Sequence, residues 1–582
     1  MSRAVGPYNR RSMGGEPPHG PVGADDSGPH PSSWVTGLAF GIVVVPFAVA
    51  LIRLLAAPGA TIYLPDDLAL IDLHTRRALQ WSQQLGVFDH NGWNHPGPTY
   101  FYLLSLVYRV LGSGARAMFV GATLLTATAA VACLAVVRRR TSPVRTLWAA
   151  VWLCVLAWLL ATAGTSSITY SEGALGGLVS PWNPMVVIMP LVLLVVLCGA
   201  AMDRSPLSLV AAVLVASFIV QTNISSLPPV VALVVVAAGT WAVTAVVDHR
   251  GTARPERRWG RREWVWTAAG GVVFVLMWLP PLVQQVTNDP GNLTLIERFF
   301  VAGHPGHGLG AAMWSVTAVF GVLVHGPAEV MRTYLGRTPH HVVSAVLASL
   351  GVVAVAVVVT VVGVRQRNRF AAGLGALTLV GTVATVVAVT RVVGPVFGYL
   401  VVWAVAIPFG ALIGVGTLRI PPAAHAGRRS VTSPATLRPL LCALGLVAGV
   451  LLVVRVLAIP PLSSVSDPEV GRIYRLVTPS LGHGGSVFVG DNGAGTGTTA
   501  RLLDVERFVG LVNRLDQFGY HPTVNHFWKA QFGPGYQSTG TEDRSIELST
   551  WEPSSPGEEG YLGRVGDMAV TVTEGSDTTF AG

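Results

Sequence analysis

Charged residues are scarce in this sequence. Only 12% of the 582 residues are Asp, Glu, Lys or Arg, against about 25% in a typical soluble protein, and Lys529 is the sole lysine. Apolar residues make up 51% of the chain, and the mean hydropathy is +0.54. Uncharged runs recur along the chain, each close to the roughly 20 residues that cross a bilayer. A water-soluble fold is excluded, and the composition predicts an α-helical polytopic membrane protein.

Cysteine is also scarce. Its four occurrences, at Cys133, Cys154, Cys198 and Cys442, all fall inside apolar runs. None lies in the C-terminal part of the chain, so neither a disulfide framework nor a cysteine-based metal site is expected. We interpret the four thiols as small packing residues.

Acidic residues are concentrated near the C-terminus. From Asp467 onward, 8 basic residues accompany 15 acidic ones, so this part carries −7 and the rest of the chain +16. The positive excess sits in short links between apolar runs, at residues 138–140, 250–262, 365–369 and 419–438. Short basic loops mark the cytoplasmic side of a membrane. The net charge of +9 therefore reports topology, and no nucleic-acid partner is expected.

Three parts follow from this pattern. Residues 1–33, rich in Gly, Pro, Ser and His, are predicted to form a disordered cytoplasmic tail, residues 34–457 the membrane domain, and residues 458–582 a small extracytoplasmic α/β domain. Richness in Ala, Val, Gly and Arg with almost no Lys is typical of a GC-rich bacterial genome, so the expected location is a bacterial plasma membrane.

Thirteen apolar runs give two span counts. If all of them cross, there are thirteen spans, but some basic links then face outward. If 98–112 and 311–326 dip in without crossing, eleven spans remain and each basic link is cytoplasmic. Both counts place the C-terminal domain and the long loops 58–97 and 284–341 outside.

The C-terminal domain shows a short α/β pattern. A strand is predicted over 486–489, a helix over 500–518 and a strand over 522–527. The glycine-rich segment 491–497 follows the first strand. It is either a phosphate-binding turn or a flexible strand-to-helix loop.

Two adjacent carboxylates, Asp66 and Asp67, follow the first span. Carboxylates at a membrane surface need solvent, a partner or a cation. Neighbouring negative charges raise the pKa of one of them, which suits a general base. Alternatively, one of the pair caps an amphipathic helix that is predicted over 67–85 to lie in the membrane interface.

A polar, proline-containing turn then leads into an aromatic run at 99–104. His95 in this turn either binds substrate, ligates a metal or hydrogen-bonds the turn, and Asn94 beside it is a further substrate-binding candidate. The aromatic residues either serve the substrate or form an interfacial belt.

These two segments together resemble the GT-C glycosyltransferase superfamily, which includes protein mannosyltransferases, aminoarabinose transferases and cell-wall arabinosyltransferases. The resemblance covers about residues 34–140. It implies a donor sugar on a polyprenyl phosphate and a cell-envelope glycan or protein as acceptor. It also implies that Asp66 or Asp67 is the base, or the ligand of a divalent cation (Mg²⁺ or Mn²⁺). The sequence departs from the commoner pattern in Gly97, inserted within His-Pro-Pro, and in Asp-Asp where Asp-Glu is frequent.

Further substrate-binding candidates lie at the predicted outer ends of other runs. Trp182 offers a face for a sugar ring or anchors the interface. Arg391 or Arg298 holds the carrier's phosphate by bidentate hydrogen bonds, or Arg391 merely snorkels to the surface. The remaining candidates are Glu172 and Asn183.

Two other functions remain open: a transporter or flippase for lipid carriers, and a non-catalytic scaffold for envelope assembly. Transporters place polar groups near the bilayer midplane. Here the runs at 342–364 and 439–457 are almost purely apolar, and polar residues gather at the outer rim. This pattern favours chemistry at the outer surface.

Overall fold

A computed structural model gives the fold of the chain. It describes residues 33–575 apart from 58, 60, 90, 164–174, 251–259, 328–329, 331–340, 420–433, 492–498, 550–556, 558 and 567. The predicted tail up to residue 32, Glu172 and residues 492–498 of the glycine-rich segment lie outside the described residues.

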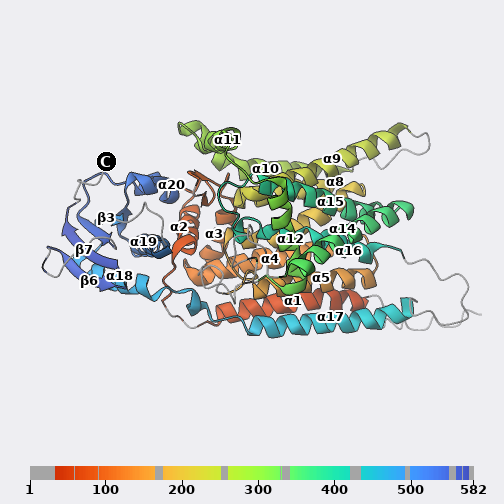
Figure 1. The fold of residues 1–582 in the computed structure, drawn as a ribbon, viewed down its shortest axis with the longest axis horizontal. Coiled ribbons are helices and arrows are strands. Elements are labelled where there is room, and N and C mark those ends of the chain that lie inside the picture. The colour runs from red at the N-terminus through yellow and green to blue at the C-terminus, as the bar shows by residue number, and fades with distance from the viewer. Residues whose placement is uncertain are drawn as a thin grey trace, which may run out of the picture.

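Apolar helices form one elongated bundle with a mixed domain at one end (Figure 1). Nine helices among the described residues are long and apolar enough to cross a membrane. The bundle helices are α1 (Ser33–Leu55), α4 (Ala115–Arg138), α5 (Pro143–Thr162), α6 (Asn183–Val186), α7 (Ile188–Met202), α8 (Pro206–Thr222), α9 (Leu227–Arg250), α10 (Arg261–Thr287), α12 (Leu309–His325), α14 (Val342–Arg365), α15 (Arg369–Thr390), α16 (Pro408–Thr417) and α17 (Pro434–Leu457). The predicted polytopic helical fold is confirmed.

The basic links between helices gather at one end of the bundle. Arg138, at the end of α4, donates from Nε to Thr36 Oγ1 at the start of α1, over 3.2 Å. The guanidinium of Arg140 lies 5.9 Å from the ring centroid of Phe370 at the start of α15. The guanidinium of Arg438 in α17 lies 4.7 Å from the ring centroid of Trp34 in α1. We call this the basic end, and the opposite end, which carries the C-terminal domain, the domain end.

Helix α3 (Thr99–Leu111) does not run between the two ends. Arg116, at the start of α4, donates to the backbone oxygen of Ala57, just after α1, over 2.7 Å. Helix α4 therefore begins where α1 ends, and α3 between them stays at the domain end. Its 13 residues extend only about 20 Å, less than the roughly 30 Å hydrocarbon core.

Helix α12 likewise has both ends near the domain end. The backbone N–H of His307, just before α12, donates to Thr390 O at the end of α15, over 3.1 Å. His325, the last residue of α12, has its ring 5.3 Å from that of His341, which precedes α14. Since α14 and α15 meet at the basic end, these contacts lie at the other end. The arrangement fits eleven crossings, with α3 and α12 dipping in.

The first long loop contains a helix that is more deeply buried than the sequence predicts. Helix α2 (Asp66–Leu79) is shorter than the predicted 67–85 and packs between α3 and a helix of the C-terminal domain. Asp72 and His74 are buried with it, so the polar face of α2 packs against protein instead of facing solvent, as a helix on the membrane surface would. The alternative that Asp66 or Asp67 caps this helix is wrong, because Pro65 occupies the N-cap position without a side-chain cap hydrogen bond. A two-stranded ribbon, β1 (Phe88–Asp89) and β2 (Trp93–Asn94), connects α2 to α3.

The C-terminal domain is a five-stranded mixed sheet in the order β4–β3–β5–β7–β6. Strand β3 runs parallel to β4 and β5, and β7 is antiparallel to β5 and β6. Figure 1 shows α19 between this sheet and α2. The elements are α18 (Pro468–Leu481), β3 (Ser486–Asp491), α19 (Thr499–Gln517), β4 (His521–Thr523), α20 (Lys529–Phe532), β5 (Arg544–Ser549), β6 (Tyr561–Val565) and β7 (Met568–Glu574).

The predicted α/β character of this domain is confirmed. Strand β3 and helix α19 match the predicted 486–489 and 500–518. The second predicted strand, 522–527, is reduced to β4 and a 3₁₀ turn at His526–Trp528. Strands β5, β6 and β7 are additional to the prediction.

Candidate active site

Of the two adjacent carboxylates, Asp67 is the one that bonds to a residue of the bundle. Its Oδ2 accepts a hydrogen bond of 2.7 Å from Nε1 of Trp182, just before α6. Burial raises the pKa of the Asp67 carboxyl, while the bond from Trp182 lowers it in part and the charge of Asp89 raises it. A carboxylate with a raised pKa is a stronger proton acceptor. Such shifted groups are enriched at functional sites.

Asp66 differs from Asp67 in its backbone. Its φ is +41°, in the left-handed region that a non-glycine residue seldom occupies and that costs of order 1–3 kcal/mol. Both residues lie in the first turn of α2 and are half-buried.

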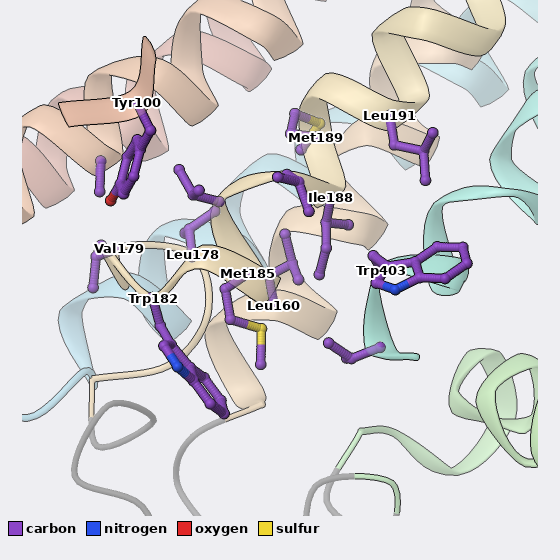
Figure 2. Close-up of a cluster of buried hydrophobic side chains, with 14 of the residues drawn as sticks. Tyr100, Leu160, Leu178, Val179, Trp182, Met185, Ile188, Met189, Leu191 and Trp403 are labelled. Carbon is purple, nitrogen blue, oxygen red and sulfur yellow. The ribbon is translucent and has the colours of Figure 1, made fainter. Parts of the chain in front are cut away.

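Trp182 is not an exposed membrane anchor. Its side chain is only 3% exposed, and Figure 2 shows it at the edge of an apolar cluster that includes Met185 and Leu160. The centroid of its indole lies 5.4 Å from that of the Tyr399 ring. The anchor reading is therefore wrong, and one face of the site is aromatic.

His95 and Asn183 meet beside this face. His95 Nε2 lies 3.2 Å from Asn183 Nδ2, and His95 Nδ1 accepts a bond of 3.3 Å from the backbone N–H of Ile224. Burial lowers the pKa of His95 to about 4, with Asp89 opposing the shift. The imidazole is therefore neutral at pH 7. The structure brings together Asp67, Trp182, Asn183 and His95 from two loops that are distant in sequence.

Asn94 has a structural part in this arrangement. Its backbone N–H donates to Asn292 Oδ1 and its backbone oxygen accepts from Asn292 Nδ2, both over 2.8 Å. Its side-chain Nδ2 donates to Gly86 O. The amide is thus used inside the protein, joining the first outer loop to α11 (Asn292–Val301).

A cavity of about 420 Å³ opens near α11 and the end of α15. Arg391 lines it, together with the rings of His304 and His307. Its other lining residues are Phe299, Phe300, Gly303, Gly306, Gly308, Thr390 and Val393. A guanidinium and imidazoles around a space of this size suit an anionic group with an apolar extension.

Aromatic contacts join the cavity to the carboxylate. Trp93 lies 5.6 Å from Phe299 and 5.9 Å from His95 between ring centroids. On the other side, Tyr399, which packs on Trp182, stacks at 5.5 Å on Phe397, six residues beyond Arg391. The cavity and Asp67 are therefore parts of one region at the domain end.

The two arginine candidates have different environments. Both side chains are exposed, but Arg391 lines the cavity, whereas Arg298 on α11 is not among the cavity's lining residues. Sequence position alone gave no reason to separate them, because both follow apolar segments at the same end of the bundle.

Glu506 of α19 lies close enough to Asp67 to be affected by its charge, which the sequence did not reveal. Burial raises the pKa of its carboxyl to about 7, and the negative charges of Asp467 and Asp67 add to the shift, while Arg507 opposes it. The predicted helix 500–518 contained this residue, but nothing in its periodicity indicated which face meets the first outer loop.

The carboxylates fit a divalent cation only in part. Among the described residues, no group of three or more His, Cys, Asp or Glu side chains could hold a metal ion. Mg²⁺ often takes one or two protein carboxylates and completes its shell with water and substrate phosphate oxygens. Asp66 and Asp67 match that type of site and do not match a cation enclosed by protein ligands.

The comparison with known proteins bears on the fold. No family model and no curated protein sequence matches the chain. The crystal structure of ArnT from Cupriavidus metallidurans bound to undecaprenyl phosphate aligns with a TM-score of 0.51 at 13% identity, over 93% of this chain and 98% of that chain. The apo state of that ArnT aligns with a TM-score of 0.51 at 12% identity, over the same shares. This chain has the fold of ArnT, a GT-C glycosyltransferase, and the predicted GT-C resemblance is confirmed at the level of the fold.

Replacing Asp67 by Asn is expected to stabilise the folded protein at about pH 8. The raised pKa means that the folded protein holds this proton more tightly than the unfolded chain does, so stability is lost as the pH rises through the folded pKa. Asn does not ionise and still offers an oxygen to Trp182. The apparent Tm of Asp67→Asn should exceed that of the wild type at about pH 8 and match it near about pH 3, where both states are protonated.

The matched control is Asp203→Asn, because Asp203 is ion-paired with Arg140 at the basic end. Relative to the wild type, this variant should gain no stability as the pH is raised over the same range. A lower Tm of Asp67→Asn than of the wild type at the alkaline end of that range would contradict the raised pKa.

Proposed function

We propose that this chain is an integral membrane glycosyltransferase that moves a sugar from a polyprenyl-phosphate carrier to a cell-envelope acceptor at the outer face. The observation that carries the proposal is the half-buried Asp67 carboxylate, held by Trp182 at the domain end of an ArnT-like fold. The ArnT structure with this fold contains undecaprenyl phosphate. Because folds host many functions, the site residues bear the rest of the argument.

Asp67 is assigned as the general base. The acceptor's hydroxyl oxygen attacks the anomeric carbon of the donor sugar, and the hydroxyl proton passes to a carboxylate oxygen of Asp67. The bond between the anomeric carbon and the phosphate oxygen breaks, and polyprenyl phosphate leaves with the bonding electrons. The raised pKa of Asp67 favours proton uptake, and such a group typically contributes about 10²–10⁴-fold to a rate.

Arg391 is assigned to the carrier's phosphate. Its guanidinium lines the cavity and can form two parallel hydrogen bonds to phosphate oxygens. Charge increases on this phosphate as the sugar leaves, so a fixed cation stabilises the transition state more than the ground state. The isoprenoid tail would then lie between helices at the domain end. Arg298, exposed on α11, is not assigned this role.

Trp182, His95 and Asn183 are assigned to the sugar. All three side chains are more than nine-tenths buried, so they would form the wall of the sugar site beside Asp67. Each is already fixed by a partner within the protein, so little side-chain freedom is lost when a sugar binds. Glu172 stays a candidate for the same role.

A divalent cation, Mg²⁺ or Mn²⁺, is part of the proposal. Asp66 and Asp67 would hold it together with phosphate oxygens of the carrier. When bound, it would supply positive charge next to the leaving phosphate.

The orientation is proposed from the charge pattern. Arg138, Arg140 and Arg438 lie at the end of the bundle where α1 begins, and short basic links face the cytoplasm. The N-terminus is then cytoplasmic, and the C-terminal domain lies on the outer side of a bacterial plasma membrane, where lipid-linked donors replace nucleotide sugars.

Single exposed cysteines are expected to report this orientation. All four native cysteines are buried, so the natural chain serves as the background. Phe527→Cys, at a side chain 72% exposed in the C-terminal domain, should react with a membrane-impermeant maleimide in intact cells. Arg365→Cys, exposed at the basic end, should react only after the cells are broken. Labelling of Arg365→Cys alone in intact cells would reverse the orientation.

Asp67→Asn is expected to lose sugar transfer while keeping the carrier. In lipid nanodiscs with a polyprenyl-phosphate sugar and envelope acceptors, turnover should fall by about 10²–10⁴-fold, the usual contribution of a general base. With no divalent cation added, the Kd for the carrier should stay close to that of the wild type, since the amide side chain retains the shape of the carboxylate it replaces. Turnover is measured as released polyprenyl phosphate.

Asp203→Asn is again the control, and Asp66→Asn separates the two adjacent carboxylates. Transfer by Asp67→Asn at the wild-type rate would overturn the assignment of the base. Carrier binding without transfer by the wild type, accompanied by movement of the lipid between leaflets, would favour the flippase. No carrier binding at all would favour the scaffold.

A further inference from the structure

The C-terminal domain contacts α2 and the residues just before it along the whole length of the helix. Before the helix, the backbone N–H of Asp467 donates to Tyr63 O, and the Tyr63 N–H donates to Ser466 Oγ, both over 2.9 Å. Gly510 of α19 packs so closely that a Cβ there would lie 2.7 Å from Leu64 O. The start of α2, where Asp66 and Asp67 lie, is thus set against the C-terminal domain.

The second half of α2 makes further bonds to the same domain. His74 Nε2 lies 3.1 Å from the backbone oxygen of Gln531, and Arg77 donates to the backbone oxygen of Phe532 over 2.8 Å. Burial lowers the pKa of His74 to about 3, and the charge of Arg77 contributes, so this imidazole is neutral at pH 7 and serves only as a hydrogen-bonding group. Both ends of α2 are therefore fixed from outside the membrane bundle.

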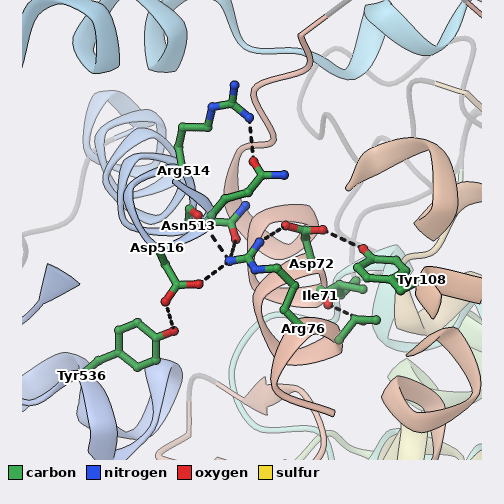
Figure 3. Close-up of polar contacts among 10 residues, drawn as sticks. Ile71, Asp72, Arg76, Tyr108, Asn513, Arg514, Asp516 and Tyr536 are labelled. Atoms are coloured by element: carbon green, nitrogen blue, oxygen red, sulfur yellow. Dashed lines mark hydrogen bonds and ion pairs between the residues drawn. The ribbon is translucent and has the colours of Figure 1, made fainter. Parts of the chain in front are cut away.

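Arg76 is the centre of this contact (Figure 3). Its guanidinium pairs with Asp72, one turn earlier on α2 and only 1% exposed. It also donates to Asp516 Oδ2 over 2.7 Å and to Asn513 Oδ1 over 2.9 Å, both on α19. A planar guanidinium reaches three partners in fixed directions, which the ammonium of lysine does not.

The network extends into both neighbouring parts of the protein. Tyr108 of α3 donates from its hydroxyl to Asp72 Oδ1 over 2.7 Å. Tyr536 of the C-terminal domain donates to Asp516 Oδ1 over 2.8 Å. Arg76 thus joins α3 and α19 through two carboxylates that are each bonded to a tyrosine. Removing one member of a buried charge network leaves the others without compensation.

The position of Asp67 is linked to this network because Asp67 and Arg76 lie on the same helix, α2. Arg76 lies nine positions after Asp67, about 14 Å along the helix axis, so the two side chains do not touch. Trp182, however, belongs to the bundle, while α2 is held by α19. The bond between Asp67 and Trp182 therefore depends on where α2 lies between α3 and α19.

We infer that Arg76 is a positioning residue: by joining Asp72 to Asp516 it fixes α2 between α3 and α19 and so holds Asp67 at the reacting groups. The inference rests on the proposed function. It makes the C-terminal domain part of the active site, beyond the binding of an acceptor or a partner that the sequence led us to expect of it. Arg76 should therefore govern turnover and leave the affinity for the carrier alone.

Arg76→Gln and Asp516→Asn test this in the full-length protein in nanodiscs. A reacting group misplaced by about 1 Å costs about 100-fold in rate, so kcat should fall by about that factor. The KM for the carrier should change by less than about threefold, since its proposed phosphate site lies elsewhere. Arg544→Gln is the control: it breaks the pair between Arg544 and the exposed Glu574 in the same domain, and kcat should stay at the wild-type value.

Hydrogen exchange supplies a readout that does not need activity. The backbone amides of residues 66–73 should exchange faster in Arg76→Gln and Asp516→Asn, and unchanged in Arg544→Gln. Asp516 is 29% exposed, so Asp516→Asn should fold even where Arg76→Gln does not. Arg76→Lys keeps the charge and should give intermediate values of both kcat and exchange.

The outcomes separate the two claims. Slower turnover together with faster exchange supports the positioning role. A change in only one of the two, or in neither, overturns it, as does a KM that rises in step with the loss of kcat. Where the wild type transfers no sugar, the proposed function fails, and the exchange rates alone decide whether Arg76 holds the start of α2.

Discussion

One hydrogen bond, from the indole of Trp182 to the carboxylate of Asp67, joins the two parts of this molecule on which the site depends. The indole belongs to the helical bundle, and the carboxylate belongs to a helix that the C-terminal domain holds. A half-buried carboxylate with one donor is costly to keep ionised, and its raised pKa reflects that cost. A cavity with a guanidinium lies at the same end of the bundle.

The surrounding polar groups are paired so that few are free to move. His95 Nδ1 accepts from the backbone N–H of Ile224, Asn94 and Asn292 exchange two hydrogen bonds, and Asp72 is bonded by both Arg76 and Tyr108. Buried networks of this kind hold side chains in one geometry when every member is satisfied. The cavity by contrast is lined by glycines, imidazoles and Arg391, which leaves room for an incoming anion.

Local signals in the sequence predicted much of this. Long uncharged runs indicated the bundle. The runs that form α3 and α12 were the two that had to dip in without crossing for each basic link to face the cytoplasm. The acidic pair and the turn at His95 indicated the site. The bond from Trp182 to Asp67 spans 115 residues, and no local pattern reports such a contact. The helical face that carries Glu506 and Asn513, and the cavity that Arg391 lines and Arg298 does not, are set by packing and were beyond the sequence for the same reason.

Determining the structure of the protein in nanodiscs with a bound polyprenyl-phosphate sugar, by electron cryomicroscopy, tests the central claim most directly. We expect the phosphate within hydrogen-bonding distance of Arg391, the isoprenoid between helices at the domain end, and the anomeric carbon facing Asp67. A carrier bound with its sugar away from Asp67, or at the basic end, would contradict it.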